Sequence, residues 1–208
     1  LTHTRVVMIA GNHDCLQDAS YYSCYDWADN VTFLASEELT SVDFPELNTE
    51  VFGFSYHSRE ITEPRYDTLI APRNDRLHIL LAHGGDASHV PIRFGALAAS
   101  GFDYIALGHI HQPRIWQNAP MAYCGSPEPM DPTDQGRRGY IMGEISGSSC
   151  RFAWYALASC QYVSLRITVN PTTTNSLLID SIRPHLEQAP RDIFLLQLTG
   201  RRDPDITF

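Results

Sequence analysis

The sequence lacks two features that would place the protein in other classes. No apolar run approaches the roughly 18 to 20 residues that a membrane-spanning helix needs. Nor is there a C-x-x-C pair among the five cysteines. An odd number of cysteines without paired spacing is typical of reduced thiols rather than of a disulfide framework. We therefore expect a cytoplasmic protein with no membrane segment.

Positive charge is also scarce. Fifteen Lys and Arg residues stand against 24 Asp and Glu residues, which gives a formal net charge of -9 at pH 7. Non-specific binding to nucleic acid depends on basic side chains that neutralise phosphates. The composition therefore argues against an extended nucleic-acid surface, although it leaves a local phosphate site open.

Several short apolar runs each end in a small-residue turn that carries a metal-ligand side chain. Apolar runs closed by glycine are typical of buried strands, and the loops that follow such strands often present chemistry on a rigid scaffold. Repetition of this design indicates one shared site. The runs and turns are residues 6–10 before Gly11-Asn12-His13-Asp14, residues 78–82 before His83-Gly84-Gly85, and residues 104–107 before Gly108-His109-Ile110-His111.

The third turn is the most specific of these motifs. In an extended backbone, residues i and i+2 point to the same side, so His109 and His111 are expected to face one pocket while Ile110 packs inward. Asn12 adds an amide oxygen and His83 a third imidazole. Such a mixed nitrogen and oxygen set suits Mn, Fe or Zn.

His13 is expected to have a different role. It follows Asn12 directly and should point away from the ligand direction. It is therefore a candidate to protonate or stabilise a leaving oxygen. The competing interpretation is a histidine that only shapes the turn.

The order of these motifs resembles the calcineurin-like metallophosphoesterases. The Gly-His-Ile-His-Gln-Pro block at 108–113, followed by Tyr-Cys-Gly-Ser-Pro-Glu at 123–128, is similar to the SbcD-type DNA double-strand-break repair exonucleases. The resemblance implies a four-layer α/β/β/α sandwich with the site at the strand ends. It also implies Asn12, His83 and His109 on one metal ion and His111 on its neighbour.

The same resemblance implies the reaction and the partners. With two divalent ions, most simply Mn, a metal-bound hydroxide would attack a DNA phosphodiester while His13 assists the leaving group. DNA, a second copy of the chain and an SMC-like ATPase of the SbcC type are the implied partners. Ser126 is expected to line the substrate groove, although Gly-Ser-Pro is equally typical of an ordinary turn.

One departure from the family pattern is large. The family's Asp-x-His turn, and a second turn whose aspartate bridges two metals, have no counterpart in this sequence. We therefore expect residues 1–158 to be a metallophosphoesterase domain without its N-terminal motifs, and 159–208 to be the start of a small α+β capping domain.

The missing carboxylates limit the expected metal content. The implied ligands are all neutral, whereas divalent ions of this kind normally need carboxylates. We therefore expect at most one ion in this fragment, and no activity from the fragment alone. Asp14 and Asp86 lie near the motifs, and a role as substitute ligand is the alternative for each. Asp14 is expected instead to cap the following helix, and Asp86 a loop or helix start.

Two alternative functions remain open. The motifs indicate phosphoester hydrolysis without naming the substrate, so a small-molecule phosphatase or a nucleotide phosphodiesterase is one alternative. A non-catalytic scaffold module is the other.

Glycine and proline residues often mark turns and loops, so their positions help to predict the remaining helices and strands. Pro184 is expected to interrupt the last helix. We expect helices over 18–29, 92–100 and 176–186, strands over 31–34, 39–44, 50–56, 162–169 and 193–198, a loop with a short helix over 57–76, and hairpins over 114–123 and 139–157.

Overall fold

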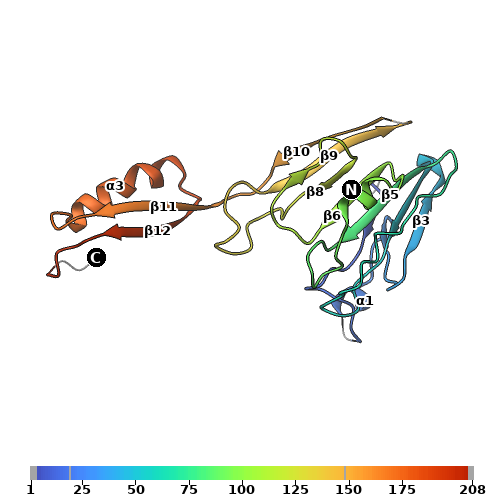
Figure 1. Cartoon of the computed structure of the whole chain (residues 1–208), viewed down its shortest axis with the longest axis horizontal. Coiled ribbons are helices and arrows are strands. Elements are labelled where there is room, and N and C mark those ends of the chain that lie inside the picture. The colour runs from blue at the N-terminus through green and yellow to red at the C-terminus, as the bar shows by residue number, and fades with distance from the viewer. Residues whose placement is uncertain (1–3, 19, 148, 206–208) are drawn as a thin grey trace. The chain divides into compact units, whose positions relative to one another are not determined.

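The computed structural model describes residues 4–18, 20–147 and 149–205, and its elements form a mixed α/β fold (Figure 1). The predicted α/β class is confirmed. The chain divides into two compact units, which we describe separately. The first comprises Leu1–Gly125 with Ile141–Tyr155, and the second comprises Ser126–Tyr140 with Ala156–Phe208.

The first unit is organised around a six-stranded sheet with the order β3-β4-β5-β6-β8-β7. The inner pairs β4·β5, β5·β6 and β6·β8 are parallel, whereas the pairs β3·β4 and β7·β8 at the edges are antiparallel. A short 3-10 helix, Pro45–Leu47, joins β3 to β4. The strands are β3 (Thr40–Phe44), β4 (Thr49–Gly53), β5 (Leu77–His83), β6 (Tyr104–Gly108), β7 (Arg114–Ile115) and β8 (Met121–Tyr123).

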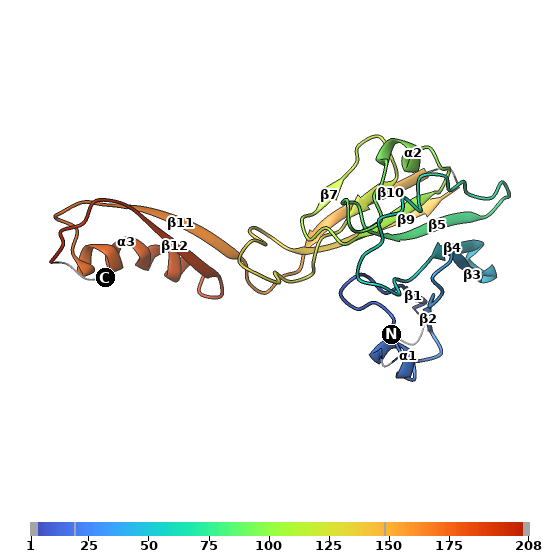
Figure 2. The same ribbon diagram turned by 60° about the horizontal axis from the view of Figure 1, so that its bottom comes forward.

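One face of this sheet forms the hydrophobic core. Alternate residues of β5 and β6 are buried, including Leu80, Ile105 and Leu107. They cluster with Leu97 of α2 (Phe94–Ala98) and with the segment after β4. The helix α2 is labelled in Figure 2. The short helix predicted within the segment after β4, residues 57–76, is not formed. The segment contributes buried Ile61, Tyr66 and Ala71 to the core.

The opposite face carries a second β layer. Strands β1 (Val6–Met8) and β2 (Val31–Phe33) pair in parallel. A Cβ added at Gly53 of β4 would lie 2.9 Å from Ile9 and 3.2 Å from Leu34, the residues that follow β1 and β2. The absence of a side chain at Gly53 therefore lets the two layers approach closely.

The first helix is much shorter than predicted. The helix expected over 18–29 is only α1 (Tyr21–Cys24). Tyrosine, serine, cysteine and aspartate are weak helix formers. The rings of Tyr22 and Trp27 stack at a centroid distance of 5.9 Å, and Tyr22 also stacks on Phe33 of β2 at 5.5 Å. Ring packing against β2 therefore replaces further helical turns.

A hairpin completes the first unit. Strands β9 (Gly139–Ser146) and β10 (Ser149–Ala156) form their own two-stranded sheet. The ring of Phe152 on β10 meets Tyr104 of β6 at a centroid distance of 5.1 Å. The hairpin predicted over 139–157 is confirmed.

The second unit is a β-α-β arrangement. Strands β11 (Tyr162–Val169) and β12 (Ile193–Gly200) pair in parallel, and α3 (Asn175–Gln188) connects them. The expectation that Pro184 interrupts the helix is wrong, because α3 continues to Gln188. A proline removes one hydrogen bond and can bend a helix without ending it.

Candidate metal centre

The end of β5 presents His83 toward the second β layer. Alternation along β5 places Leu80 and Ala82 in the core and His83 on the other face. Two tyrosines fix its backbone. The amide of His83 donates to the Tyr66 hydroxyl at 2.9 Å, and the Tyr56 hydroxyl donates to the carbonyl of His83 at 2.9 Å.

Two glycines make room for the imidazole of His83. A Cβ at Gly11 would lie 2.4 to 2.8 Å from three atoms of the ring, and a Cβ at Gly108 would lie 3.0 Å from Nδ1. The amide of Gly11 donates to Oδ1 of Asp14 at 2.7 Å. The prediction that Asp14 caps the following helix is therefore wrong, because Asp14 closes its own turn and α1 begins only at Tyr21.

Three potential ligand atoms converge at this point. Oδ1 of Asn12 lies 2.8 Å from Nε2 of His83 and 3.3 Å from Nδ1 of His109. The paired register of His83 with Gly108 in the parallel strands β5 and β6 brings these carboxyl ends together. Ligands about 2.1 Å from one ion lie roughly 3 Å apart when their bonds are near right angles. Both distances from Asn12 Oδ1 to a ring nitrogen are therefore compatible with ligands of one divalent ion.

His109 reaches this position through a strained backbone. Strand β6 ends at Gly108. His109, the next residue, has a backbone φ of 96°, a value that residues other than glycine rarely adopt. The predicted extended arrangement of His109 and His111 is therefore wrong. Ile110 packs against the core, as expected.

Asp86 is an acceptor that joins two histidines. Its Oδ2 accepts from Nε2 of His109 at 2.7 Å, and its Oδ1 accepts from the amides of Ser88 and His89 at 2.9 and 3.0 Å. The ring of His89 adds a contact from Nδ1 to Oδ1 at 2.8 Å. Asp86 therefore caps its loop, as predicted, and also meets the candidate centre.

Asp86, His89 and His109 form a second potential donor group. Each offers a ligand atom within 4.8 Å of the others. The sequence assigned no role to His89, and for Asp86 it favoured a cap over a role as ligand. The available signal was the spacing His83-x-x-Asp86-x-x-His89 directly after an apolar strand.

The electrostatics suit a cation. Burial first, and then the neighbouring His109, lower the pKa of His83 to about 4, so the imidazole is neutral at pH 7 and can act as a ligand. Partial burial would raise the pKa of Asp86. The hydrogen bonds from His109, Ser88 and His89 outweigh that effect and hold it well below its usual range. Asp86 therefore supplies one negative charge near the neutral donors Asn12 and His83.

The other predicted site residues lie in different surroundings. The side chain of His13 is exposed and close enough to His83 to influence its pKa. His111 is half-buried and belongs to no group of three His, Cys, Asp or Glu donors found among the described residues. Ser126 falls in the second unit, and its side chain is 7% exposed. Its Oγ has no hydrogen-bond partner within the described part of the chain. The roles assigned to these three residues stay predictions.

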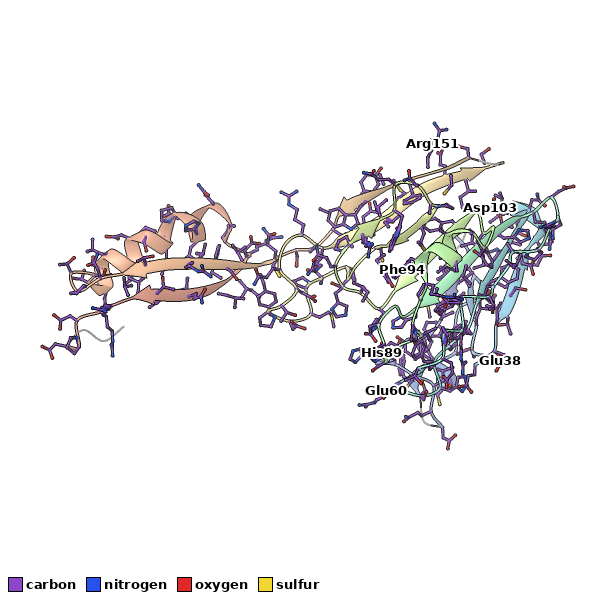
Figure 3. The ribbon with its side chains drawn as sticks, viewed as in Figure 1. Glu38, Glu60, His89, Phe94, Asp103 and Arg151 are labelled. Atoms are coloured by element: carbon purple, nitrogen blue, oxygen red, sulfur yellow. The ribbon has the colours of Figure 1, made fainter. Side chains whose placement is uncertain are left out.

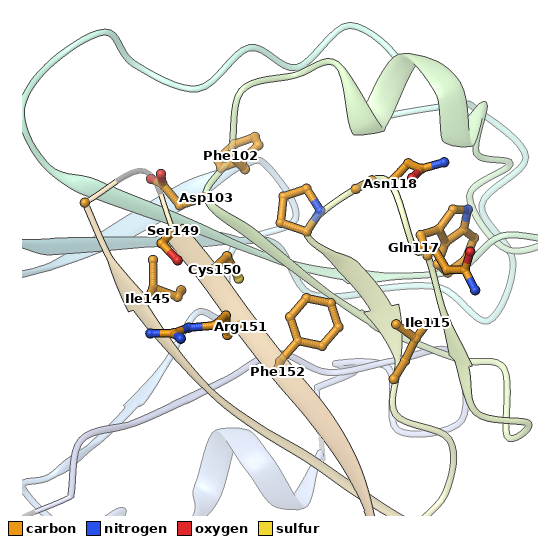
Figure 4. A pocket seen from close by; sticks show the side chains of 14 residues that line it. Phe102, Asp103, Ile115, Gln117, Asn118, Ile145, Ser149, Cys150, Arg151 and Phe152 are labelled. Atoms are coloured by element: carbon orange, nitrogen blue, oxygen red, sulfur yellow. The ribbon is translucent and has the colours of Figure 1, made fainter.

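A cavity of the first unit lies elsewhere. It has a volume of about 620 Å³ and is lined by Asp103, Asn118, Arg151 and Phe152, among other residues (Figure 4). Asp103 and Pro120 precede β6 and β8, whereas His109 follows β6. His89 is labelled in Figure 3 near the metal-centre end, and Asp103 and Arg151 near the other. The cavity is therefore separate from the candidate centre.

Comparison with known proteins agrees with this centre. The calcineurin-like phosphoesterase family model matches residues 1–113. An uncharacterized metallophosphoesterase of Bacillus subtilis (strain 168), YhaO, is 26% identical over 158 residues. The aligned region covers 71% of this chain and 38% of that relative, so the chain corresponds to well under half of the relative's length.

None of the helices in the described residues has the length and apolar character needed to cross a membrane.

Proposed function

Because the chain belongs to the calcineurin-like phosphoesterase family, we propose that its strand-end centre binds a divalent metal ion and serves phosphoester hydrolysis. The convergence of Asn12 Oδ1, His83 Nε2 and His109 Nδ1, with His83 neutral, is the observation that supports this proposal. These three residues would hold the ion. When bound, such an ion polarises a phosphoryl oxygen and acidifies a water molecule.

The role of His13 in this proposal is proton transfer. Its exposed side chain next to Asn12 is available to a bound substrate. We propose that it donates a proton to the leaving oxygen. We also propose manganese as the working metal, on the basis of the motif resemblance; it is one of the ions that such a nitrogen and oxygen set suits.

The finer proposal concerns the substrate. We propose that the full-length natural protein cleaves DNA phosphodiesters as a nuclease subunit in double-strand-break repair. The support is the motif resemblance at 108–113 and 123–128. On the same basis we propose a cytoplasmic location, a second copy of the chain and an SbcC-type ATPase as partners, and Ser126 as a groove residue.

A specific observation favours a second candidate. The net charge of -9 opposes extended contact with a polyanion, which supports hydrolysis of small phosphomonoesters or nucleotide diesters instead. The test is to incubate the full-length protein and Mn with linear duplex DNA and, separately, with a small chromogenic phosphodiester. Cleavage of both supports the nuclease. Turnover of the small ester without DNA cleavage supports the second candidate, and no turnover of either overturns both.

The variants His13→Ala and His109→Ala separate catalysis from metal binding in the same assay. We expect His13→Ala to retain bound Mn, measured by elemental analysis, while turnover falls roughly 10²- to 10⁴-fold, as loss of a general acid does. His109→Ala should lose the metal as well. Loss of metal from His13→Ala would contradict the assignment of His13.

A further inference from the structure

We propose that Asp86 is a positioning residue that selects the tautomer of His109 and thereby aims its Nδ1 at the metal. The inference rests on the proposed metal centre and assigns a new role within it. From the sequence, Asp86 was expected to cap a loop or helix start, with a role as direct ligand as the alternative. Its contacts with His109 and His89 extend that role.

The first step concerns the proton on His109. A carboxylate oxygen can only accept a hydrogen bond, so the 2.7 Å contact between Asp86 Oδ2 and His109 Nε2 requires the hydrogen to be on Nε2. An imidazole that binds a metal ion must be neutral and then carries a single N–H. In that form, with its hydrogen on Nε2, Nδ1 of His109 keeps a lone pair.

The second step concerns what faces that lone pair. Nδ1 of His109 lies 3.3 Å from Oδ1 of Asn12, and this oxygen also lies 2.8 Å from Nε2 of His83. A lone pair facing a carbonyl-type oxygen at this distance is unfavourable unless a positive charge lies between them. The tautomer that Asp86 selects is therefore the one that a cation requires.

The third step is that the loop holding Asp86 is itself fixed. The amide of Ile61 donates to the carbonyl of Ser88 at 2.9 Å, and the amide of Val90 donates to the carbonyl of Ile61 at 2.6 Å. Val90 is fully buried with φ 40, a conformation that costs free energy for a β-branched residue and persists only under strong constraint. These contacts fix the backbone of the loop and therefore the position of Asp86.

A competing assignment makes Asp86 a direct ligand together with His89 and His109. If Nε2 of His109 were its ligand atom in that group, it would have to lose its hydrogen on metal binding. The positioning role keeps that hydrogen in place. The side chain of Asp86 is 46% exposed, so burial alone does not decide between the two roles.

The experiment measures the hydrogens of His109 directly in the whole chain. Imidazole ¹⁵N NMR of the metal-free protein should show His109 with its hydrogen on Nε2. In Asp86→Ala we expect a mixture of both tautomers, whereas Asp86→Asn retains an acceptor and should keep most of the Nε2–H form. Asp203→Ala is the matched control, because Asp203 accepts from an amide two residues on at 2.9 Å but contacts no histidine in the described residues.

Metal affinity provides the second measurement. Calorimetric titration with Mn should show binding weakened about 10- to 100-fold in Asp86→Ala, as is typical when a ligand histidine loses its carboxylate partner, and unchanged in Asp203→Ala. Thermal unfolding checks that each variant is folded. Should Asp86→Ala fail to fold, Asp86→Asn is expected to bind Mn with an intermediate loss.

Two results would overturn the proposal. One is an unchanged tautomer of His109 in Asp86→Ala. The other is loss of the Nε2–H signal of His109 in the wild-type protein loaded with diamagnetic Zn, which would make Asp86 and His89 direct ligands. Absence of any metal binding by the wild-type chain would instead reject the metal centre itself, while the tautomer measurement on metal-free protein would still stand.

Discussion

The ring of His83 occupies space that a side chain at position 11 would need. Any Cβ there would lie within 2.8 Å of three ring atoms, a distance that real Cβ atoms essentially never show. The ring is confined from the other side by Gly108 and by the tyrosines that hold the backbone of His83. Expanding a close-packed interior costs free energy. The glycines at positions 11 and 108 therefore determine where Nε2 of His83 points.

We therefore expect Gly11→Ala to displace the His83 ring and to weaken Mn binding by at least about tenfold, with a loss of about 1 to 3 kcal/mol in unfolding free energy from overpacking. Calorimetry and urea unfolding measure the two effects. Gly95→Ala in α2 is the control, since a Cβ there would meet nothing within 4 Å. Normal Mn binding by Gly11→Ala would mean that His83 is not a ligand.

The partly buried His83 also makes the metal-free protein sensitive to acid. Its pKa is about 4 in the folded chain against 6.5 for the ordinary group. As the pH falls through the window between these values, the unfolded chain binds the proton first, so folding stability falls. The effect is absent above about pH 6.5 and complete below about pH 4.

We expect this group to contribute a stability loss of roughly 3 kcal/mol at most between pH 7 and pH 4. Urea unfolding in the presence of a chelator, followed by tryptophan fluorescence, would measure it. His83→Gln should flatten the pH dependence, whereas His185→Gln, a change at an exposed histidine of α3, should not. An identical pH profile in His83→Gln would show that this histidine is not the acid-sensitive group.

At the scale of elements, strands were easier to predict than helix ends. The runs 78–82 and 104–107 lie within β5 and β6 because their alternate residues enter the core, and 162–169 coincides with β11. Helix ends depend on packing. Tyr22 and Trp27 stack on one another instead of extending α1, and α3 continues past Pro184.

The same distinction applies to the candidate centre. Asn12, His83 and His109 could be named because each lies at or soon after the end of a recognisable strand. The contact of Asp86 with His109 could not be predicted from the sequence. It depends on a loop that is held by Ile61, which lies more than twenty residues earlier in the chain. The positive φ of His109 is likewise set by tertiary structure.

Pro184 gives a prediction at this scale. It lies inside α3 and lacks the amide hydrogen that would donate to the carbonyl of Asp180. Pro184→Ala should therefore stabilise α3 by about 1 to 3 kcal/mol, measured by urea unfolding followed by circular dichroism at 222 nm. Pro190→Ala, just beyond the helix, should not show this gain. Destabilisation by Pro184→Ala would mean that packing of the proline ring outweighs the missing hydrogen bond.

At the scale of the whole molecule, the two compact units carry different spectroscopic probes. All three tryptophans, Trp27, Trp116 and Trp154, lie in the first unit, which also holds the candidate metal centre. The longest described helix, α3, lies in the second unit. Tryptophan fluorescence therefore follows the first unit, while the helical signal at 222 nm depends strongly on the second.

We expect Mn to act on only one of these signals. A ligand that binds the folded form alone stabilises it by about 2.7 kcal/mol at a hundredfold excess over its Kd, so the fluorescence transition in urea should move to higher concentration. The transition at 222 nm should stay in place, and excess chelator should reverse the fluorescence shift.

His109→Ala is the matched control, because it removes a proposed ligand and should abolish the shift. Equal movement of both transitions would mean that the units unfold as one cooperative body, and an unmoved fluorescence transition would mean that the centre at Asn12, His83 and His109 binds no metal.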